Sequence, residues 1–175
     1  MKNAVIHIKE NSIDIGKYLR YALSAYLKSW WWAYVLPLAL CLALSVVNIN
    51  FIFAAVVLLF LVFTMILFFV VIYYGLVPES RYSTMKKEMN VSDEGITLFL
   101  KKPIVKEENE DDTPEFKIEE VKLQWELISA VKGTDECLLL QFVTPKYSFL
   151  AIPYDAFDDE NHLKEMLSIV RTHIG

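Results

Sequence analysis

The chain has 175 residues, a formal net charge of −5 and a mean hydropathy of +0.35. This length holds one ordinary domain, or a small domain with membrane anchors. The charge divides into +3 over residues 1–81 and −8 over residues 82–175. The acidic second part argues against nucleic acid as a partner, because phosphate binding depends on basic patches.

The N-terminal segment, residues 1–29, contains two expected elements. Residues 4–9 alternate weakly between apolar and polar side chains, which predicts a short strand. Residues 12–28 repeat apolar side chains at helical spacing and carry Lys and Arg on another face, with Asn11 or Ser12 as the cap. Two interpretations of this amphipathic helix remain open: it lies in the membrane interface, or it is the cytoplasmic extension of a first membrane span.

The next segment, residues 30–75, is predicted to be a transmembrane helical hairpin. From Ser29 to Pro78 there is no Asp, Glu, Lys, Arg or His over 50 residues. One span needs about 20 apolar residues, and a single helix of this length would reach about 75 Å. Two spans, about 30–47 and 51–74, joined by a turn at residues 48–50, fit the membrane instead.

Aromatic side chains at both cytoplasmic ends of the hairpin are predicted to mark the membrane interface. Indole and phenol rings favour the headgroup level. Consecutive helical residues point about 100° apart, so three adjacent tryptophans are expected to fan out rather than form a ligand cage. The predicted anchors are Lys28, Trp30, Trp31 and Trp32 before the first span and Tyr73 and Tyr74 at the end of the second.

The flanking charges predict the orientation of the hairpin. Five Lys or Arg residues precede the first span, Arg81, Lys86 and Lys87 follow the second, and the connecting turn has none. Cytoplasmic flanks carry the excess of Lys and Arg, so both termini are expected in the cytoplasm. No cleavable signal is expected, because a basic polar segment precedes the apolar run. Two separated cysteines, Cys41 and Cys137, imply no disulfide framework and suit a reducing compartment.

Residues 82–175 are predicted to form a cytoplasmic domain of short antiparallel strands followed by one helix. Asp93 to Gly95 and Gly133 to Glu136 are turn signals between alternating segments. The alternation of residues 116–125 slips at Glu119 and Glu120, which predicts a bulge. Asp158 or Asp159 is expected to cap the last helix. The predicted fold class is therefore an α+β membrane protein, with a two-helix hairpin followed by a small antiparallel sheet or barrel that the C-terminal helix closes.

The C-terminal residues "WELISAVKGTDECLLL" and "FLAIPYDAF" resemble the YcxB-like family of bacterial membrane proteins. The matching positions are Trp125, Ile128, Val131, Leu138, Leu140, Ile152, Pro153 and Phe157. The resemblance covers most of the chain in layout and about 35 residues in motif. It implies a bacterial inner-membrane protein with a pleckstrin-homology-like (PH-like) cytoplasmic domain. The family often has a basic residue after the proline, where this chain has Tyr154, and it has no established activity.

Candidate reactive groups give no catalytic constellation, so we predict no catalytic residue, cofactor or metal. The acidic run of residues 107–115 lacks the ligand spacing of a calcium loop and is interpreted as a solvated loop. His162 and His173 are about 16 Å apart along one helix and cannot share a metal ion. Cys137 begins an apolar strand and is expected to be buried.

The expected function is binding or scaffolding by a membrane-anchored module, not an enzymatic one. The expected partners are membrane lipid, together with a protein or a second copy of the chain. The alternative is lipid recognition through a basic pocket of residues such as Lys101, Lys102 or Lys146. A third possibility is a metal-dependent enzyme that uses the acidic loop.

Overall fold

The structure is a computed structural model that describes residues 5–103 and 116–174. Its contacts divide the chain into two compact units. The first combines the N-terminal segment up to Tyr18 with the chain from Val77 onward, and the second holds Leu19 to Leu76. The predicted acidic loop lies outside the described residues.

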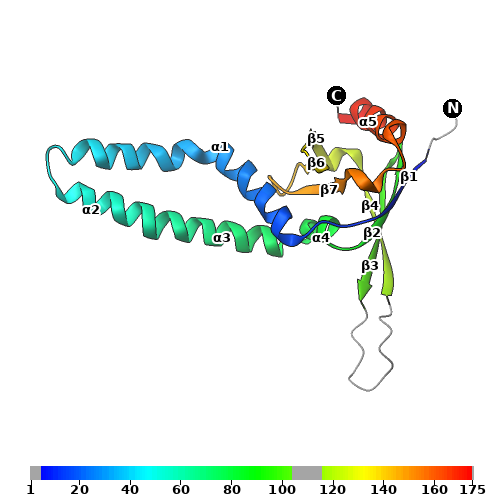
Figure 1. The fold of residues 1–175 in the computed structure, drawn as a ribbon, viewed down its shortest axis with the longest axis horizontal. Coiled ribbons are helices and arrows are strands. Elements are labelled where there is room, and N and C mark those ends of the chain that lie inside the picture. Colours follow the sequence, from blue (N-terminus) through cyan, green and yellow to red (C-terminus); the bar gives the residue numbers. More distant parts are fainter. Residues whose placement is uncertain (1–4, 104–115, 175) are drawn as a thin grey trace, which may run out of the picture. The chain divides into compact units, whose positions relative to one another are not determined.

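The first unit contains two antiparallel sheets (Figure 1). A four-stranded sheet has the order β1-β2-β3-β4, and a three-stranded sheet has the order β5-β6-β7. The strands are β1 (Ile6–Asn11), β2 (Lys87–Ser92), β3 (Gly95–Pro103), β4 (Phe116–Leu123), β5 (Ile128–Gly133), β6 (Cys137–Phe142) and β7 (Phe149–Pro153). Short 3-10 turns, η2 (Trp125–Leu127) and η3 (Tyr154–Ala156), follow β4 and β7.

One hydrophobic core joins the two sheets and the last helix, α5 (Glu160–Ile174). Strand side chains alternate between the faces of a sheet, so every second residue of β2 and β3 points into the core. Met166 and Val170 bring α5 onto the same core. The predicted apolar face of this helix is thereby confirmed, and Asp159 caps its start by accepting a hydrogen bond from the His162 N–H at 2.8 Å.

A tight turn joins β2 to β3 at the predicted Asp93 to Gly95 position. Gly95 has a φ of +146°, and a Cβ there would lie 2.3 Å from the Leu123 carbonyl oxygen. Only glycine fits this position, for both reasons. The second predicted turn, between β5 and β6, is also present.

The second unit is an antiparallel helical hairpin. Its first helix is the part of α1 (Ile15–Leu44) from Leu19 onward. Its second helix is built from α2 (Asn50–Val57), the π-helical turn η1 (Leu58–Val62) and α3 (Phe63–Leu76). The Tyr34 and Phe63 rings meet edge to face, with centroids 5.1 Å apart. Both helices are long and apolar enough to cross a membrane, and most of their large apolar side chains are exposed. Apolar surface of this extent is typical of a membrane protein.

The boundaries of the N-terminal segment differ from the prediction. Residues 5–18 belong to the sheet unit, because β1 pairs with β2 and buries Ile6 and Ile8 in its core. The helix begins at Ile15 and runs without a break into the first predicted span. This continuity favours the cytoplasmic extension of the span over a separate interfacial helix. Its cap is Asp14, whose carboxylate accepts the Gly16 N–H at 2.7 Å, and neither Asn11 nor Ser12.

The end of the first span and the start of the sheet domain also differ from the prediction. The first span was expected to reach residue 47, but α1 ends at Leu44. Beyond it, the N–H groups of Val46 and Val47 donate to the carbonyls three residues earlier, which forms the turn. The sheet domain was expected from Tyr82. A further helix, α4 (Pro78–Thr84), comes first, and its proline at the helix start suits that position.

The predicted antiparallel sheet is confirmed, but the barrel alternative and the predicted bulge are wrong. The sheet does not close into a barrel, because β4 and β5 belong to separate sheets and η2 connects them. Glu119 and Glu120 form no bulge, since β4 pairs with β3 in unbroken register. The slip in the apolar pattern has another cause: Phe116 and Ile118 are exposed, and only the later part of β4 reaches the core.

Candidate functional site

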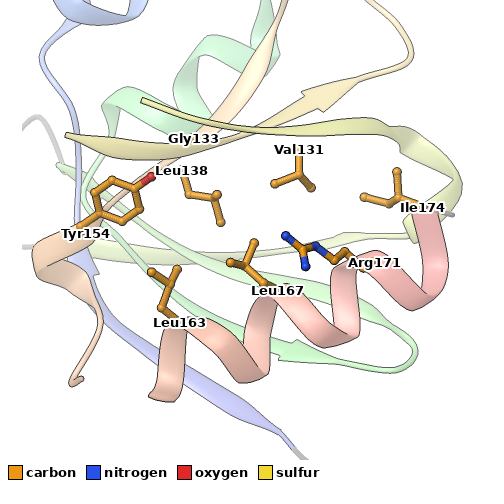
Figure 2. A pocket seen from close by; sticks show the side chains of 8 residues that line it. All are labelled: Val131, Gly133, Leu138, Tyr154, Leu163, Leu167, Arg171 and Ile174. Carbon is orange, nitrogen blue, oxygen red and sulfur yellow. The ribbon is translucent and has the colours of Figure 1, made fainter. Parts of the chain in front are cut away.

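An apolar groove lies between the β5-β6 face and α5 (Figure 2). It has a volume of about 400 Å³. Strand residues that share one face of the sheet form one wall, and residues spaced along one side of α5 form the other. The lining residues are Val131, Gly133 and Leu138 from the strands, Tyr154 from η3, and Leu163, Leu167, Arg171 and Ile174 from α5.

Two polar groups interrupt the apolar lining. The Tyr154 side chain lies at one end of the groove, and Arg171 lies nearer the other end beside Ile174 (Figure 2). Arg171 is exposed, and among the described residues no carboxylate forms an ion pair with its guanidinium. An apolar surface with one guanidinium suits a ligand that has apolar groups and one anionic group.

Gly133 leaves room at the Tyr154 end of the groove. A Cβ at this position would lie 3.0 Å from the Tyr154 hydroxyl oxygen, closer than ordinary van der Waals contact. Any larger residue would therefore press against the tyrosine and narrow the groove.

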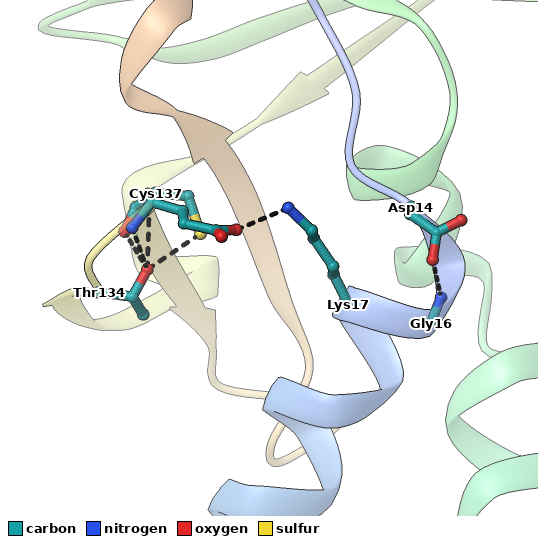
Figure 3. Close-up of polar contacts among 6 residues, drawn as sticks. Asp14, Gly16, Lys17, Thr134 and Cys137 are labelled. Atoms are coloured by element: carbon teal, nitrogen blue, oxygen red, sulfur yellow. Dashed lines mark hydrogen bonds and ion pairs between the residues drawn. The ribbon is translucent and has the colours of Figure 1, made fainter.

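Polar contacts fix the turn that follows Gly133 (Figure 3). The Thr134 hydroxyl donates to the Cys137 carbonyl at 2.9 Å and accepts the Cys137 N–H at 3.0 Å. Lys17, in the first turn of α1, forms an ion pair with Glu136 at 2.7 Å. Cys137 is buried at the start of β6, as predicted. These contacts link the turn after β5 to the start of β6 and to the first turn of α1.

A fully buried lysine, Lys87 of β2, lies against the outer edge of β7 in the three-stranded sheet. Strand β7 stands at the sheet edge, where backbone groups need other partners. The Ser83 hydroxyl of α4 donates to the Phe149 carbonyl at 2.6 Å and accepts the Ala151 N–H at 2.9 Å. Lys87 Nζ donates to the Ala151 and Ser83 carbonyls, both at 3.3 Å. Two side chains thus replace a neighbouring strand along β7.

Burial lowers the pKa of Lys87 to about 7, because removal from water disfavours the ammonium form. Within the described part of the chain, no carboxylate pairs with this amine. A neutral amine still has two hydrogens, which match the two carbonyls that it contacts. This buried amine is therefore a structural group that is close to its titration point near neutral pH.

The predicted interface anchors occupy different environments. Trp30, Trp31, Trp32 and Tyr73 are exposed, whereas Tyr74 is buried, with its ring edge-on to Tyr73 at 5.1 Å. The expected fan of three indoles is wrong in one respect, because the Trp30 and Trp32 rings stack with centroids 6.0 Å apart. Lys28 directly precedes this aromatic group in α1.

The motif residues of the predicted family resemblance are placed mainly in the core. Ile128, Leu140, Ile152 and Phe157 are buried there, while Pro153 is partly buried. Trp125 is also buried, and its indole N–H lies 3.2 Å from the Ser92 carbonyl and 3.1 Å from the Asp93 carbonyl, at the β2-β3 turn.

Two further motif positions, Val131 and Leu138, line the groove. Motif residues therefore contribute to both the core and the groove.

The basic residues named for lipid recognition do not form an open pocket. Lys101 pairs with Glu10 and Glu88, and Lys102 pairs with Glu119. The hydrogen bond with Lys101 lowers the pKa of Glu10. These carboxylates compete with any lipid phosphate. The third residue, Lys146, lies with its ammonium 5.3 Å from the centre of the Tyr147 ring.

His162 and His173 lie at separate places on α5. The His162 ring packs edge-on to Phe157, and the His173 ring stacks on Trp125 with centroids 5.2 Å apart. Over residues 5–103 and 116–174, no group of three or more His, Cys, Asp or Glu side chains is arranged to hold a metal ion.

Sequence reasoning missed the two most informative side chains. Arg171 follows Leu163 and Leu167 at four-residue intervals, so it lies on the apolar side of α5. Lys87 precedes Met89 and Val91 at two-residue intervals, so it lies on the inward face of β2. In both cases the available signal was a charged residue at a position where the pattern requires an apolar one.

The fold and the groove together define a class: a small α+β unit with an open apolar groove, joined to a hairpin of membrane-spanning length. Comparison of the chain with protein-family models, curated proteins and solved structures gives no match. The resemblance to the YcxB-like family therefore stays a prediction.

Proposed function

We propose that the chain is a membrane-anchored binding module that holds a protein partner in the groove between β5 and α5. The observation that carries this proposal is the groove itself, with apolar walls, exposed residues at Gly133 and Arg171, and a guanidinium that faces it. The function is binding or scaffolding rather than catalysis. The pairing of Lys101 and Lys102 with carboxylates makes lipid headgroups less suitable partners for this unit.

The proposed location is a bacterial inner membrane, with both termini and the sheet unit in the cytoplasm. Support comes from the two apolar helices and from the Lys and Arg residues that flank them on one side only. The strand order, with a terminal helix on the core, is compatible with a PH-like module of the YcxB-like type.

The orientation can be tested at the hairpin turn. In a cysteine-free protein that carries Asn50→Cys, we expect labelling of intact cells by a membrane-impermeant thiol reagent, because Asn50 begins α2 at the far end of the hairpin. A cysteine at Lys117 of the sheet unit is the matched control, and it should react only after the cells are opened. Labelling of Lys117→Cys but not Asn50→Cys in intact cells would reverse the orientation.

The binding function can be tested by photocrosslinking in native membranes. A photoreactive phenylalanine at Ile174, at the rim of the groove, should form a discrete protein adduct. The same group at Lys164, an exposed α5 residue that pairs with Glu160, should not form it. Val131→Trp should abolish the adduct, because the larger ring fills the groove. An adduct that persists in the Val131→Trp protein, or that contains only lipid, would contradict the proposal.

A further inference from the structure

We infer that two copies of the chain pair along the outer edge of β4, with the two strands antiparallel and Ile118 of one copy opposite Ile118 of the other. This surface is separate from the groove between the β5-β6 face and α5, so the inference goes beyond the proposed function. Three observations carry it: the regular edge of β4, the exposed apolar side chains on one of its faces, and the order of its charges.

The first observation is the edge itself. Strand β4 stands at the end of the four-stranded sheet, and among the described strands it pairs with β3 alone. An edge strand presents a row of backbone N–H and C=O groups to a second chain, and many edge strands block such pairing by being short or by carrying a proline or a bulge. Strand β4 has eight residues, no proline and an unbroken register with β3. Its edge is therefore regular enough to pair.

The second observation is the apolar surface at the start of β4. Val121 and Leu123 pack on the core, so the alternate residues Phe116 and Ile118 lie on the opposite face of the sheet. Ile118 is 62% exposed and Phe116 is 47% exposed. Pro103 of β3, which pairs with Phe116, is exposed as well. A second chain that covers these side chains would remove apolar surface from water, which favours association.

The third observation is the order of the charges, which selects the partner. Lys117 and Glu119 flank Ile118 and lie together on the other face of β4. When β4 pairs antiparallel with its own copy about Ile118, Lys117 of each copy lies opposite Glu119 of the other. Opposite charges in cross-strand pairs stabilise a sheet, and like charges destabilise it. Glu119 also pairs with Lys102 of its own chain, and a carboxylate has room for two donors.

The charges and the apolar side chains together select this register. Two identical antiparallel strands pair symmetrically about one residue. Four centres place like charges opposite each other, namely Lys117, Glu119, Glu120 and Lys122. A centre at Val121 pairs residues 119–123 and leaves Phe116 and Ile118 uncovered. The centre at Ile118 gathers both of these side chains from both copies on one face, because diagonal neighbours are within reach of an aromatic ring.

Disulfide crosslinking in isolated membranes tests the pairing. In a cysteine-free full chain, Ile118→Cys should give a disulfide-linked dimer on oxidation, because residues at the symmetry centre lie within disulfide reach. Lys122→Cys is the matched control on the same face of the same strand. In the proposed register the two copies of residue 122 are roughly 27 Å apart along the strands, so they should give no dimer.

A mixed dimer checks the register without changing Ile118. Phe116 of one copy lies opposite Glu120 of the other, so a mixture of Phe116→Cys and Glu120→Cys chains should crosslink. Each of these two variants alone should not, since its cysteines are roughly 14 Å apart. No dimer from either Ile118→Cys or the mixture would overturn the inference. Equal crosslinking of Ile118→Cys and Lys122→Cys would do so too, because it indicates parallel pairing or random collision. A disulfide adduct with another protein would replace the second copy as the partner.

Charge exchange tests why the strand pairs with itself. In the Ile118→Cys chain, Lys117→Glu or Glu119→Lys turns two attractive cross-strand pairs into two repulsive ones, and each should give about tenfold less dimer. A mixture of the two variants should restore the dimer, because every cross-strand pair then again joins opposite charges. Lys122→Glu makes the same change in net charge outside the paired segment and should alter the dimer yield by less than about twofold.

A mixture that crosslinks no better than the single variants would overturn the proposed register. The recovery also guards against misfolding, since two misfolded chains would not regain a dimer when they are combined. The proposed function is tested separately, because these substitutions leave the groove residues unchanged. The Ile174 adduct should therefore form in the β4 variants whatever the result of the crosslinking.

Discussion

Replacement of Lys87 by methionine is expected to abolish most of the pH dependence of stability between about pH 7 and pH 10. In the folded protein, burial lowers the pKa of this amine from its ordinary value of 10.5 to about 7. The unfolded chain then holds one more proton than the folded chain over this interval. Stability therefore rises with pH through the interval and is independent of this group below about pH 7.

The expected size of this effect is large for a single side chain. The lowered pKa corresponds to roughly 5 kcal/mol of unfolding free energy across the interval. Methionine has a similar length and no titratable group, so no charge is buried in the variant. The variant should therefore be more stable than the wild type near pH 6. Near pH 10 the order should reverse, because methionine cannot donate to the carbonyls of Ser83 and Ala151.

Unfolding by denaturant in detergent micelles measures this prediction. With Trp30, Trp31 and Trp32 replaced by phenylalanine, Trp125 is the remaining tryptophan, and it reports on the core of the sheet unit. Lys86→Met is the matched control, since Lys86 is the exposed neighbour and its change should leave the pH dependence intact. A wild-type curve that is flat over this interval, or a Lys87→Met curve as steep as the wild type, would contradict the prediction.

The sequence predicted the regular parts of the fold because periodicity reports directly on burial. The alternation at Ile6 and Ile8, the turn at Gly95 and the apolar face around Met166 all correspond to structure, since each pattern has one way to bury its apolar side chains. Periodicity was less informative where the pairing of strands determines the structure. The separation of β4 from β5 depends on which strands pair, and no local pattern carries that information.

The site was harder to predict for the same physical reason. The groove arises because α5 packs its Met166 side on the core and leaves Leu167 and Arg171 to line a groove with Val131 and Leu138 of the β5-β6 face. A helical pattern identifies the apolar side of α5 but not the part that remains uncovered. Lys87 illustrates a second limit, because a lysine in a charged sequence segment is usually solvated. Here the carbonyls of Ala151 in β7 and Ser83 in α4 give its amine two acceptors inside the protein.

Replacement of Ser83 by alanine is expected to reduce the free energy of unfolding by about 2–4 kcal/mol. The hydroxyl is fully buried and serves two backbone groups of β7 at once, the Phe149 carbonyl and the Ala151 N–H. Alanine removes the acceptor of the Ala151 N–H and a donor to the Phe149 carbonyl. No water can replace the hydroxyl at a site without solvent access. Denaturant unfolding with the Trp125 reporter measures the loss.

Thr84→Ala is the matched control for this effect. Thr84 is the next residue of α4, and its hydroxyl donates to the Ser80 carbonyl within the same helix. Removal of that bond leaves β7 unchanged, so the control should lose less than about 1 kcal/mol. Equal losses in the two variants would show that the hydroxyl of Ser83 does not stabilise the strand edge. A larger loss for Ser83→Ala means that the Ser83 hydroxyl contributes to holding α4 on the edge of β7.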